Sequence, residues 1–228
     1  MVEPNWVTAL DRAVFVTINQ HLRSSFLDAV FPFVSDLGLG HIQAISILLA
    51  VLVCGIHAGE FNKTVNFTLL KQAYSTRKHW IFPLFLALAI SGILSTVVKR
   101  TVVRDRPWGY YVKEHLAGRE MGIAVVPPLR SPLKAHGFLS GHTATSFALA
   151  TALALAIRRR KRGTIIAVLG WTLATLIGFS RIYVVDHWPL DVIAGVLLGI
   201  MCGVLATYLC RNVCPGVIAN EKEPLAVS

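Results

Sequence analysis

Residues 180–191, which read S-R-I-Y-V-V-D-H-W-P-L-D, gather the side chains of this sequence that are best suited to chemistry. The segment joins two hydrophobic runs of membrane length, and ionisable residues at the mouth of a membrane bundle are costly and usually functional. His187 and Asp191 are four residues apart, so on a helix they would share one face. A carboxylate in that position can hold one imidazole nitrogen and leave the other free to attack. The spacing therefore predicts a histidine nucleophile at His187, oriented by Asp191.

Two further polar clusters lie at predicted helix ends. Residues 99–107 read K-R-T-V-V-R-D-R-P where the second predicted span ends, and residues 139–142 read L-S-G-H where the third begins. Lysine and arginine side chains bind phosphate oxygens, and the N-terminus of a helix also favours an anion. Because all three clusters lie at helix ends on one side of the membrane, they can converge on a single site.

The composition indicates an integral membrane protein without a separate soluble domain. Of 228 residues, 54% are hydrophobic and 15% charged, with a mean hydropathy of +0.61, whereas soluble domains are about 25% charged. The net charge of +10 favours anionic lipid head groups and phosphate as partners. Nucleic acid is not expected, since no basic patch is interleaved with aromatic residues. The four cysteines show neither C-x-x-C nor metal-ligand spacing, so no zinc site is implied.

Hydrophobic runs predict an all-α, polytopic bundle of five to six spans. Spans need roughly 20 apolar residues, and the five candidates are residues 41–57, 79–98, 142–157, 164–180 and 188–210. Residues 1–40 are expected to form amphipathic, interfacial helices, which leaves open a sixth span within residues 5–36. Residues 41–212 would form the catalytic bundle, and residues 213–228 a cytoplasmic tail.

The basic loops predict the orientation of the bundle. The turn at residues 158–162, R-R-R-K-R, and the basic loop at residues 58–78 fall on one side if the spans alternate. The positive-inside rule places that side in the cytoplasm. Residues 99–141 and 181–187 would then face the periplasmic side of the inner (plasma) membrane. The basic residues of the outer loop break the charge rule, and binding of an anionic substrate explains them most simply.

Three glycines in the last span, Gly195, Gly199 and Gly203, form a small-x-x-x-small row. Such a row lets another helix approach closely. We interpret it first as packing within the chain and second as the face of a homodimer.

Together the three clusters resemble the signature motifs of the type 2 phosphatidic acid phosphatase (PAP2) family, K-x6-R-P, P-S-G-H and S-R-x5-H-x3-D. The matching residues, in motif order, are Lys99, Arg106 and Pro107; Ser140, Gly141 and His142; and Ser180, Arg181, His187 and Asp191. The resemblance covers about residues 25–212 and implies a PAP2/haloperoxidase-like core. Leu139 stands where the family has proline, which removes no catalytic group but puts the rigidity of the phosphate loop in question.

The resemblance, read with the residue types, implies a role for each matched side chain. His187 would form a phosphohistidine, and Asp191 would orient it. His142 would protonate the leaving group and then activate water. The phosphate would be bound by Lys99, Arg106, Arg181 and the helix start at Ser140 and Gly141. Three cations would supply the electrostatic stabilisation, so neither metal nor cofactor is expected.

Other residues near the motifs receive structural interpretations. Asp186 is expected to cap a helix, Asp105 to pair with a neighbouring arginine, and Arg100 and Arg104 to contact lipid head groups. The aromatic residues Trp108, Tyr110 and Tyr111 resemble an interfacial belt. The basic residues of the segment 113–134 could hold a second phosphate, and His136 is taken as structural.

The expected activity is therefore that of a metal-independent phosphatase acting on a lipid phosphate or lipid pyrophosphate. Family resemblance suggests undecaprenyl pyrophosphate, phosphatidylglycerol phosphate, phosphatidic acid or lipid A phosphate, and among these we favour undecaprenyl pyrophosphate. Two alternatives stay open: a phosphotransferase that uses the same phosphohistidine, and a non-catalytic lipid-binding or transport protein. Vanadium haloperoxidases share the phosphate-site motifs, but they are soluble, unlike this composition.

Overall fold

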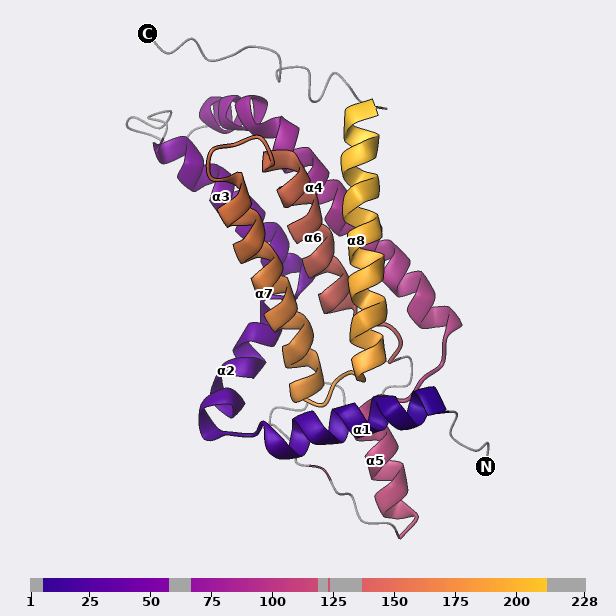
Figure 1. Cartoon of the computed structure of the whole chain (residues 1–228). Helices are drawn as coiled ribbons and strands as arrows, with labels where there is room; N and C mark the ends of the chain where they lie inside the picture. Colours follow the sequence, from indigo (N-terminus) through magenta and orange to yellow (C-terminus); the bar gives the residue numbers. More distant parts are fainter. Residues whose placement is uncertain (1–5, 58–66, 119–122, 124–136, 213–228) are drawn as a thin grey trace.

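The computed structural model describes the backbone of residues 6–57, 67–118, 123 and 137–212, with side chains described outside residues 54–79. Within these residues the chain is all helical, which confirms the predicted fold class (Figure 1). The helices are α1 Trp6–His21, α2 Ser25–Asp36, α3 Gly40–His57, α4 Phe67–Thr101, α5 Pro107–Leu116, α6 Gly141–Ile157, α7 Gly163–Tyr183 and α8 Pro189–Asn212.

The long helices identify a multi-pass membrane protein. In the described part of the chain, three segments are long and apolar enough to cross a bilayer: Trp80–Thr101 of α4, and all of α7 and α8. A fourth is counted if α2 and α3, bent by 75° at their junction, form one broken span. Helix α6 is apolar but has only 17 residues. The predicted five to six spans are thus approximate, because residues 41–57 need α2 to qualify and residues 142–157 are short of the usual roughly 20 residues.

Helix α6 lies inside the bundle, in contact with α4, α7 and α8 (Figure 1). The glycine row of α8 makes the closest approach: Gly195 packs on Ser140 and Thr143, and the next two glycines follow α6 upward. A methyl group added to Gly195 would lie 2.7 Å from the Ser140 carbonyl oxygen. The row therefore packs within the chain. A homodimer stays a prediction, and it would need another face because α6 covers this one.

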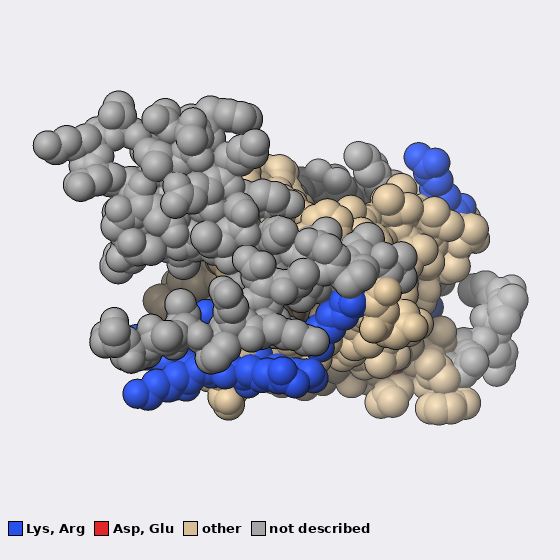
Figure 2. Space-filling model, turned by 90° about the horizontal axis from the view of Figure 1, so that it is seen from above, with Lys and Arg blue, Asp and Glu red and all other residues tan. Residues whose placement is uncertain are grey.

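The two ends of the bundle differ in charge. The turn between α6 and α7, residues 158–162, is basic and exposed, and in Figure 2, which views this end, the charged side chains in view among the described residues are Lys and Arg. At the opposite end α1 lies across the ends of α7 and α8, near the start of α5 (Figure 1). The three polar motifs meet at that opposite end.

The predicted domain boundary at residue 40 stays a prediction. The predicted cytoplasmic tail, residues 213–228, lies outside the described residues.

Candidate active site

A tight turn between α7 and α8 presents the predicted nucleophile. Helix α7 ends at Tyr183, and the backbone N–H groups of Asp186 and His187 both donate to the carbonyl of Arg181, each at 3.1 Å. Val185 makes this possible by adopting a left-handed backbone conformation with φ of 63°, which is unusual for a β-branched residue. Helix α8 begins two residues after His187, so Asp191 lies in its first turn.

The imidazole of His187 and the carboxylate of Asp191 face each other in a buried site. Nδ1 of His187 lies 3.6 Å from Oδ2 of Asp191, and the two side chains are 1% and 0% exposed. Among the described residues Nδ1 has no hydrogen-bond partner, while Oδ2 accepts the N–H of Trp188 at 3.0 Å. Catalytic hydrogen bonds are often long before substrate binds. Burial lowers the pKa of His187 well below its usual range, and Arg181 and Arg106 add to the effect, so the ring is neutral near pH 7 and able to attack.

Arg104 holds the second oxygen of Asp191, Asp11 holds Arg104, and the sequence interpretation missed both. Nη1 of Arg104 donates to Oδ1 of Asp191 at 2.6 Å, and its Nη2 pairs with Asp11. Asp11 also accepts the N–H of Leu190 at 2.8 Å. The expectation that Arg104 contacts lipid head groups is wrong, because its guanidinium bridges two carboxylates that are each 0% exposed. Asp11 shares the buried face of α1 with Phe15, and that four-residue spacing was the available signal.

Asp186 is the common partner of two predicted phosphate ligands. Nη1 of Arg106 lies 2.9 Å from its Oδ1, and Arg181 pairs with its Oδ2. Arg181 also donates to Ser35 on α2. Burial alone would raise the pKa of Asp186, but Arg181, His187 and Arg106 together lower it below the usual value. The expectation that Asp186 caps a helix is wrong, because its carboxylate serves as counter-ion to both arginines.

The first and second motifs meet at the start of α6. A methyl group built on Gly141 would lie 3.0 Å from Nζ of Lys99, so glycine gives the ammonium group room. The Ser140 hydroxyl caps α6 by accepting from Thr143, and the Ser140 N–H donates to the Asp191 carbonyl at 3.0 Å. In the described part of the chain these bonds occupy Ser140, while the N–H groups of Gly141 and His142 have no partner. The phosphate-binding role of Ser140 and Gly141 stays a prediction.

His142, the predicted acid and base, lies among the same charges. It interacts electrostatically with Arg181, His187, Lys99 and Arg106. The α2–α3 bend holds it from the other side, since a methyl group on Gly38 would lie 2.8 Å from the His142 Cβ. All eight predicted site residues are thus brought to one end of the bundle.

Aromatic residues of α1 and α5 brace the turn that carries His187. The Trp188 ring packs on Phe15 at 5.1 Å, Tyr110 at 5.8 Å and Tyr111 at 6.2 Å between centroids. Its Nε1 donates to the Asp105 carbonyl at 2.8 Å.

Tyr110 and Tyr111 were interpreted as belt residues, and here they also pack on Trp188 in the turn that carries His187. The Asp105 carboxylate pairs with Lys113 at 2.6 Å, so the expectation of a neighbouring arginine partner is wrong. His136 and most of the segment 113–134 lie outside the described residues.

No group of three or more His, Cys, Asp or Glu side chains that could hold a metal ion occurs among the described residues. Metal-free chemistry stays a prediction, since it depends on the reaction itself.

Comparison with known proteins decides the family. A model of the PAP2 superfamily matches residues 80–213, which include all three motifs. The chain belongs to the PAP2 superfamily. Among curated proteins, this PAP2 chain is similar to the lipid A 1-phosphatase of Rhizobium etli, with 31% identity over 155 residues, 66% of this chain and 61% of that protein. It thus spans about three fifths of the length of that relative.

Two further PAP2 relatives show how far the likeness extends. The undecaprenyl-diphosphatase of Sulfolobus acidocaldarius is 62% identical over 32 residues, 14% of this chain and 16% of that protein. The crystal structure of LpxE from Aquifex aeolicus superposes with a TM-score of 0.62 and 26% identity, covering 87% of this chain and 95% of that one. The fold likeness therefore includes helices outside the three motifs.

Proposed function

We propose that this chain is an integral membrane phosphatase that hydrolyses a lipid phosphate or lipid pyrophosphate through a phosphohistidine on His187. The proposal rests on one observation: the neutral, buried imidazole of His187 and the carboxylate of Asp191 lie together with three cations and a second histidine. Lys99, Arg106 and Arg181 lie close enough to interact electrostatically with both His142 and His187. Phosphoryl transfer depends mainly on positioning and charge stabilisation, which this arrangement supplies.

The reaction would proceed in two steps. Nε2 of His187 attacks phosphorus, and the bond from phosphorus to the leaving oxygen breaks while His142 donates a proton to that oxygen. Asp191 stabilises the positive charge that develops on the His187 ring. His142 then takes a proton from water, which attacks phosphorus, breaks the P–N bond and restores His187. The cations of the site neutralise the charge on the equatorial oxygens in both transition states.

Arg104 and Asp11 act as positioning residues in this scheme. Both oxygens of Asp191 are engaged, Oδ1 by Arg104 at 2.6 Å and Oδ2 by the Trp188 N–H at 3.0 Å. This fixes the plane of the carboxylate that faces His187. Groups that orient a reacting side chain in this way are worth about 10-fold to 100-fold in activity at comparable sites.

The relatives suggest which lipids to test first. The activities for which they are named, lipid A 1-phosphatase and undecaprenyl-diphosphatase, support a substrate whose phosphate is attached to a large membrane lipid. The longer match is to the lipid A 1-phosphatase, so lipid A 1-phosphate is the first candidate and undecaprenyl pyrophosphate the second.

We also propose that the site faces the periplasmic side of the inner membrane. The exposed basic turn at residues 158–162 lies at the opposite end of the bundle, and basic loops favour the cytoplasm. In intact cells, cysteine at Arg159 should resist a membrane-impermeant thiol reagent until the inner membrane is opened. Labelling before that step would invert the orientation.

The decisive experiment measures phosphate release from a panel of lipid phosphates in detergent. Wild type should release phosphate and form an acid-labile phosphoprotein, while His187→Ala should do neither. His21→Ala, a change at an exposed histidine of α1, is the matched control and should behave as wild type. Hydrolysis that survives His187→Ala would overturn the nucleophile, and phosphate passing only to a lipid acceptor would favour the transferase.

A further inference from the structure

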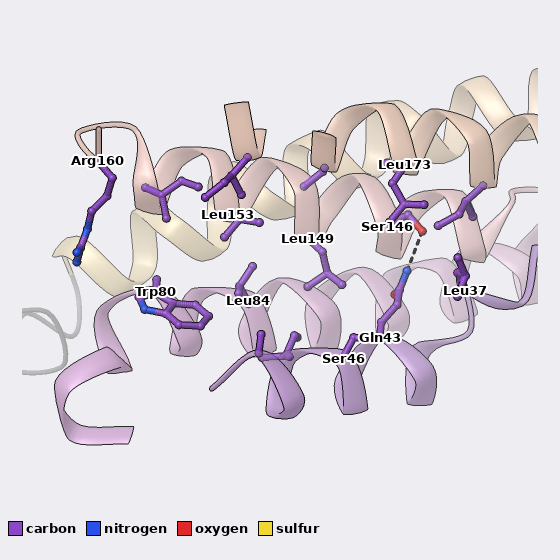
Figure 3. Close-up of a pocket in the computed structure, with 18 residues that line it drawn as sticks. Leu37, Gln43, Ser46, Trp80, Leu84, Ser146, Leu149, Leu153, Arg160 and Leu173 are labelled. Atoms are coloured by element: carbon purple, nitrogen blue, oxygen red, sulfur yellow. Dashed lines mark hydrogen bonds between the residues drawn. The ribbon is translucent and has the colours of Figure 1, made fainter. Parts of the chain in front are cut away.

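A groove in the membrane-spanning part of the bundle has no role in the chemistry described above. It lies between α3, α4, α6 and α7 and encloses a cavity of about 670 Å³ (Figure 3). Its walls are mainly apolar, with Leu84, Leu149, Leu153 and Leu173 among the lining side chains. The volume falls within the range of about 300–1,000 Å³ that is usual for small-molecule sites.

The groove has the length of one lipid chain. Its lining along α6 extends from Ser146 to Ile157, and the rise between these two residues is about 16 Å of helix. The groove ends at Ile157 and Arg160, beside the basic turn at the opposite end of the bundle, so a chain bound along it would pass the midplane of a hydrocarbon core of about 30 Å. An acyl chain that entered at the site end would therefore find apolar walls over most of its length. Dispersion contacts with the walls would favour its binding there.

One end of the groove lies one turn of α6 from the predicted general acid. Ser146, at its site end, donates to the His142 carbonyl at 2.7 Å. Leu37 lines the same end, next to Gly38, which packs against His142. A lipid whose phosphate lay at His142 and His187 would have the start of its chain near this end of the groove, and only Gly38 and its contacts with Ile177 and His142 would lie between them.

Gln43 stands at the mouth with an unused acceptor. Its side chain is buried, with 6% exposed, and its Nε2 donates to the Ser146 hydroxyl at 2.7 Å (Figure 3). Among the described residues its Oε1 accepts no hydrogen bond. A buried acceptor without a partner costs free energy, and native proteins seldom leave one unpaired. The missing donor would be an amide N–H or a hydroxyl near the head of the bound chain.

We propose that this groove binds an acyl chain of the lipid substrate and that Gln43 selects chains carrying an N–H or O–H donor near the head group. The proposal rests on the phosphatase function proposed above. Such a groove would bind lipid phosphates with amide-linked or hydroxylated chains more tightly than those with simple ester-linked chains, because an ester offers no donor to Oε1 of Gln43.

Filling the groove tests whether a chain binds there. A methyl group on Gly170 would lie 3.8 Å from the Ala150 Cβ, an ordinary contact, so Gly170→Ala is the matched control and Gly170→Leu the blocking variant. For dioleoyl phosphatidic acid, Gly170→Leu should lower kcat/KM about 10-fold or more, since each buried methylene contributes to binding. Its activity on dihexanoyl phosphatidic acid should stay within about twofold of wild type. Equal activity of both variants on the long-chain lipid would overturn the chain site.

A pair of lipids tests the selection by Gln43. Ceramide 1-phosphate carries an amide N–H and a hydroxyl beside its phosphate, and dioleoyl phosphatidic acid carries esters there. Wild type should prefer the ceramide lipid about fivefold to tenfold in kcat/KM, the value of one buried hydrogen bond. Gln43→Met should abolish this preference. Ser146→Ala, which removes the anchor of Gln43 but keeps its acceptor, should retain most of it. A preference unchanged in Gln43→Met would refute the role of Gln43.

Activity on dihexanoyl phosphatidic acid distinguishes a failure of the chain-binding groove from a failure of the phosphatase function. If wild type hydrolyses it and the groove variants also do, the variants are folded and any loss on long chains belongs to the groove. If wild type releases no phosphate from any lipid of the panel, the phosphatase function itself fails.

Discussion

Asp186 occupies the arginine pair that substrate phosphate would need, so its removal should strengthen anion binding. Its two oxygens accept Arg106 at 2.9 Å and Arg181, and its side chain is 13% exposed. A bound phosphate must share or displace these contacts. Asp186→Asn keeps the shape and one acceptor oxygen but removes the competing charge.

The size of the effect follows from those contacts. Hydrogen bonds to charged groups contribute about 1.5–3 kcal/mol each. If phosphate displaces the equivalent of one such bond, Asp186→Asn should spare about 1.4 kcal/mol, a tenfold change in affinity. The inhibition constants of inorganic phosphate and orthovanadate should therefore fall about tenfold. KM should fall with them, and kcat should also decline because product phosphate leaves more slowly.

The assay is competitive inhibition of lipid phosphate hydrolysis in detergent, with Asp105→Asn as the matched control. Asp105 pairs with Lys113 in an exposed position, with side chains 38% and 66% exposed, so its variant should leave both inhibition constants unchanged. Weaker phosphate binding in Asp186→Asn would refute the reasoning. It would mean that Asp186 holds the arginines in place for the substrate and does not compete with it.

Three more predictions follow from the site. Asp11→Asn should lower kcat about 10-fold to 100-fold with little change in KM, while Leu10→Ala, a change at the exposed preceding residue of α1, should not; equal effects on kcat would contradict the positioning role. Gly141→Ala should raise KM several-fold, because its methyl group would lie 3.0 Å from Nζ of Lys99, and an unchanged KM would exclude that ammonium from substrate binding. Because the pKa of His187 is lowered in the folded chain, only the unfolded chain takes up a proton at this residue near pH 6.5. The free energy of unfolding therefore decreases as the pH falls through 6.5. Between about pH 7.5 and pH 5.5 wild type should lose about 1.4 kcal/mol more unfolding free energy than His187→Gln, and identical losses in denaturation curves would rule this out.

The motifs could be predicted from the sequence because their spacing is local. His187 and Asp191 lie within one helical turn, and the other motif residues lie at helix ends that hydropathy locates. The partners of these residues could not be predicted in the same way. Asp11 meets Arg104 across 93 residues, and nothing in the local pattern of either residue names the other.

Asp186 shows a second limit of sequence reasoning. Its position before a helix suggested a cap. However, the left-handed backbone at Val185 turns the segment, so that the N–H groups of Asp186 and His187 both donate to the carbonyl of Arg181. A valine gives no sign of such a turn, since glycine or asparagine is the usual signal. Tertiary contacts decide the local conformation here, and the carboxylate is directed to the arginines as a result.

The bond between Asp11 and the Leu190 N–H also sets an order on biosynthesis. It joins residues 179 apart, and a ribosome adds about 5–20 residues per second. For roughly 10 to 35 seconds after α1 is made, its carboxylate has no α8 to receive it and must remain hydrated at the membrane surface. The site can close only when the last helix has inserted, so every earlier state of the chain lacks an oriented His187. A phosphatase built in this way would remain inactive in the translocon until its synthesis is nearly complete.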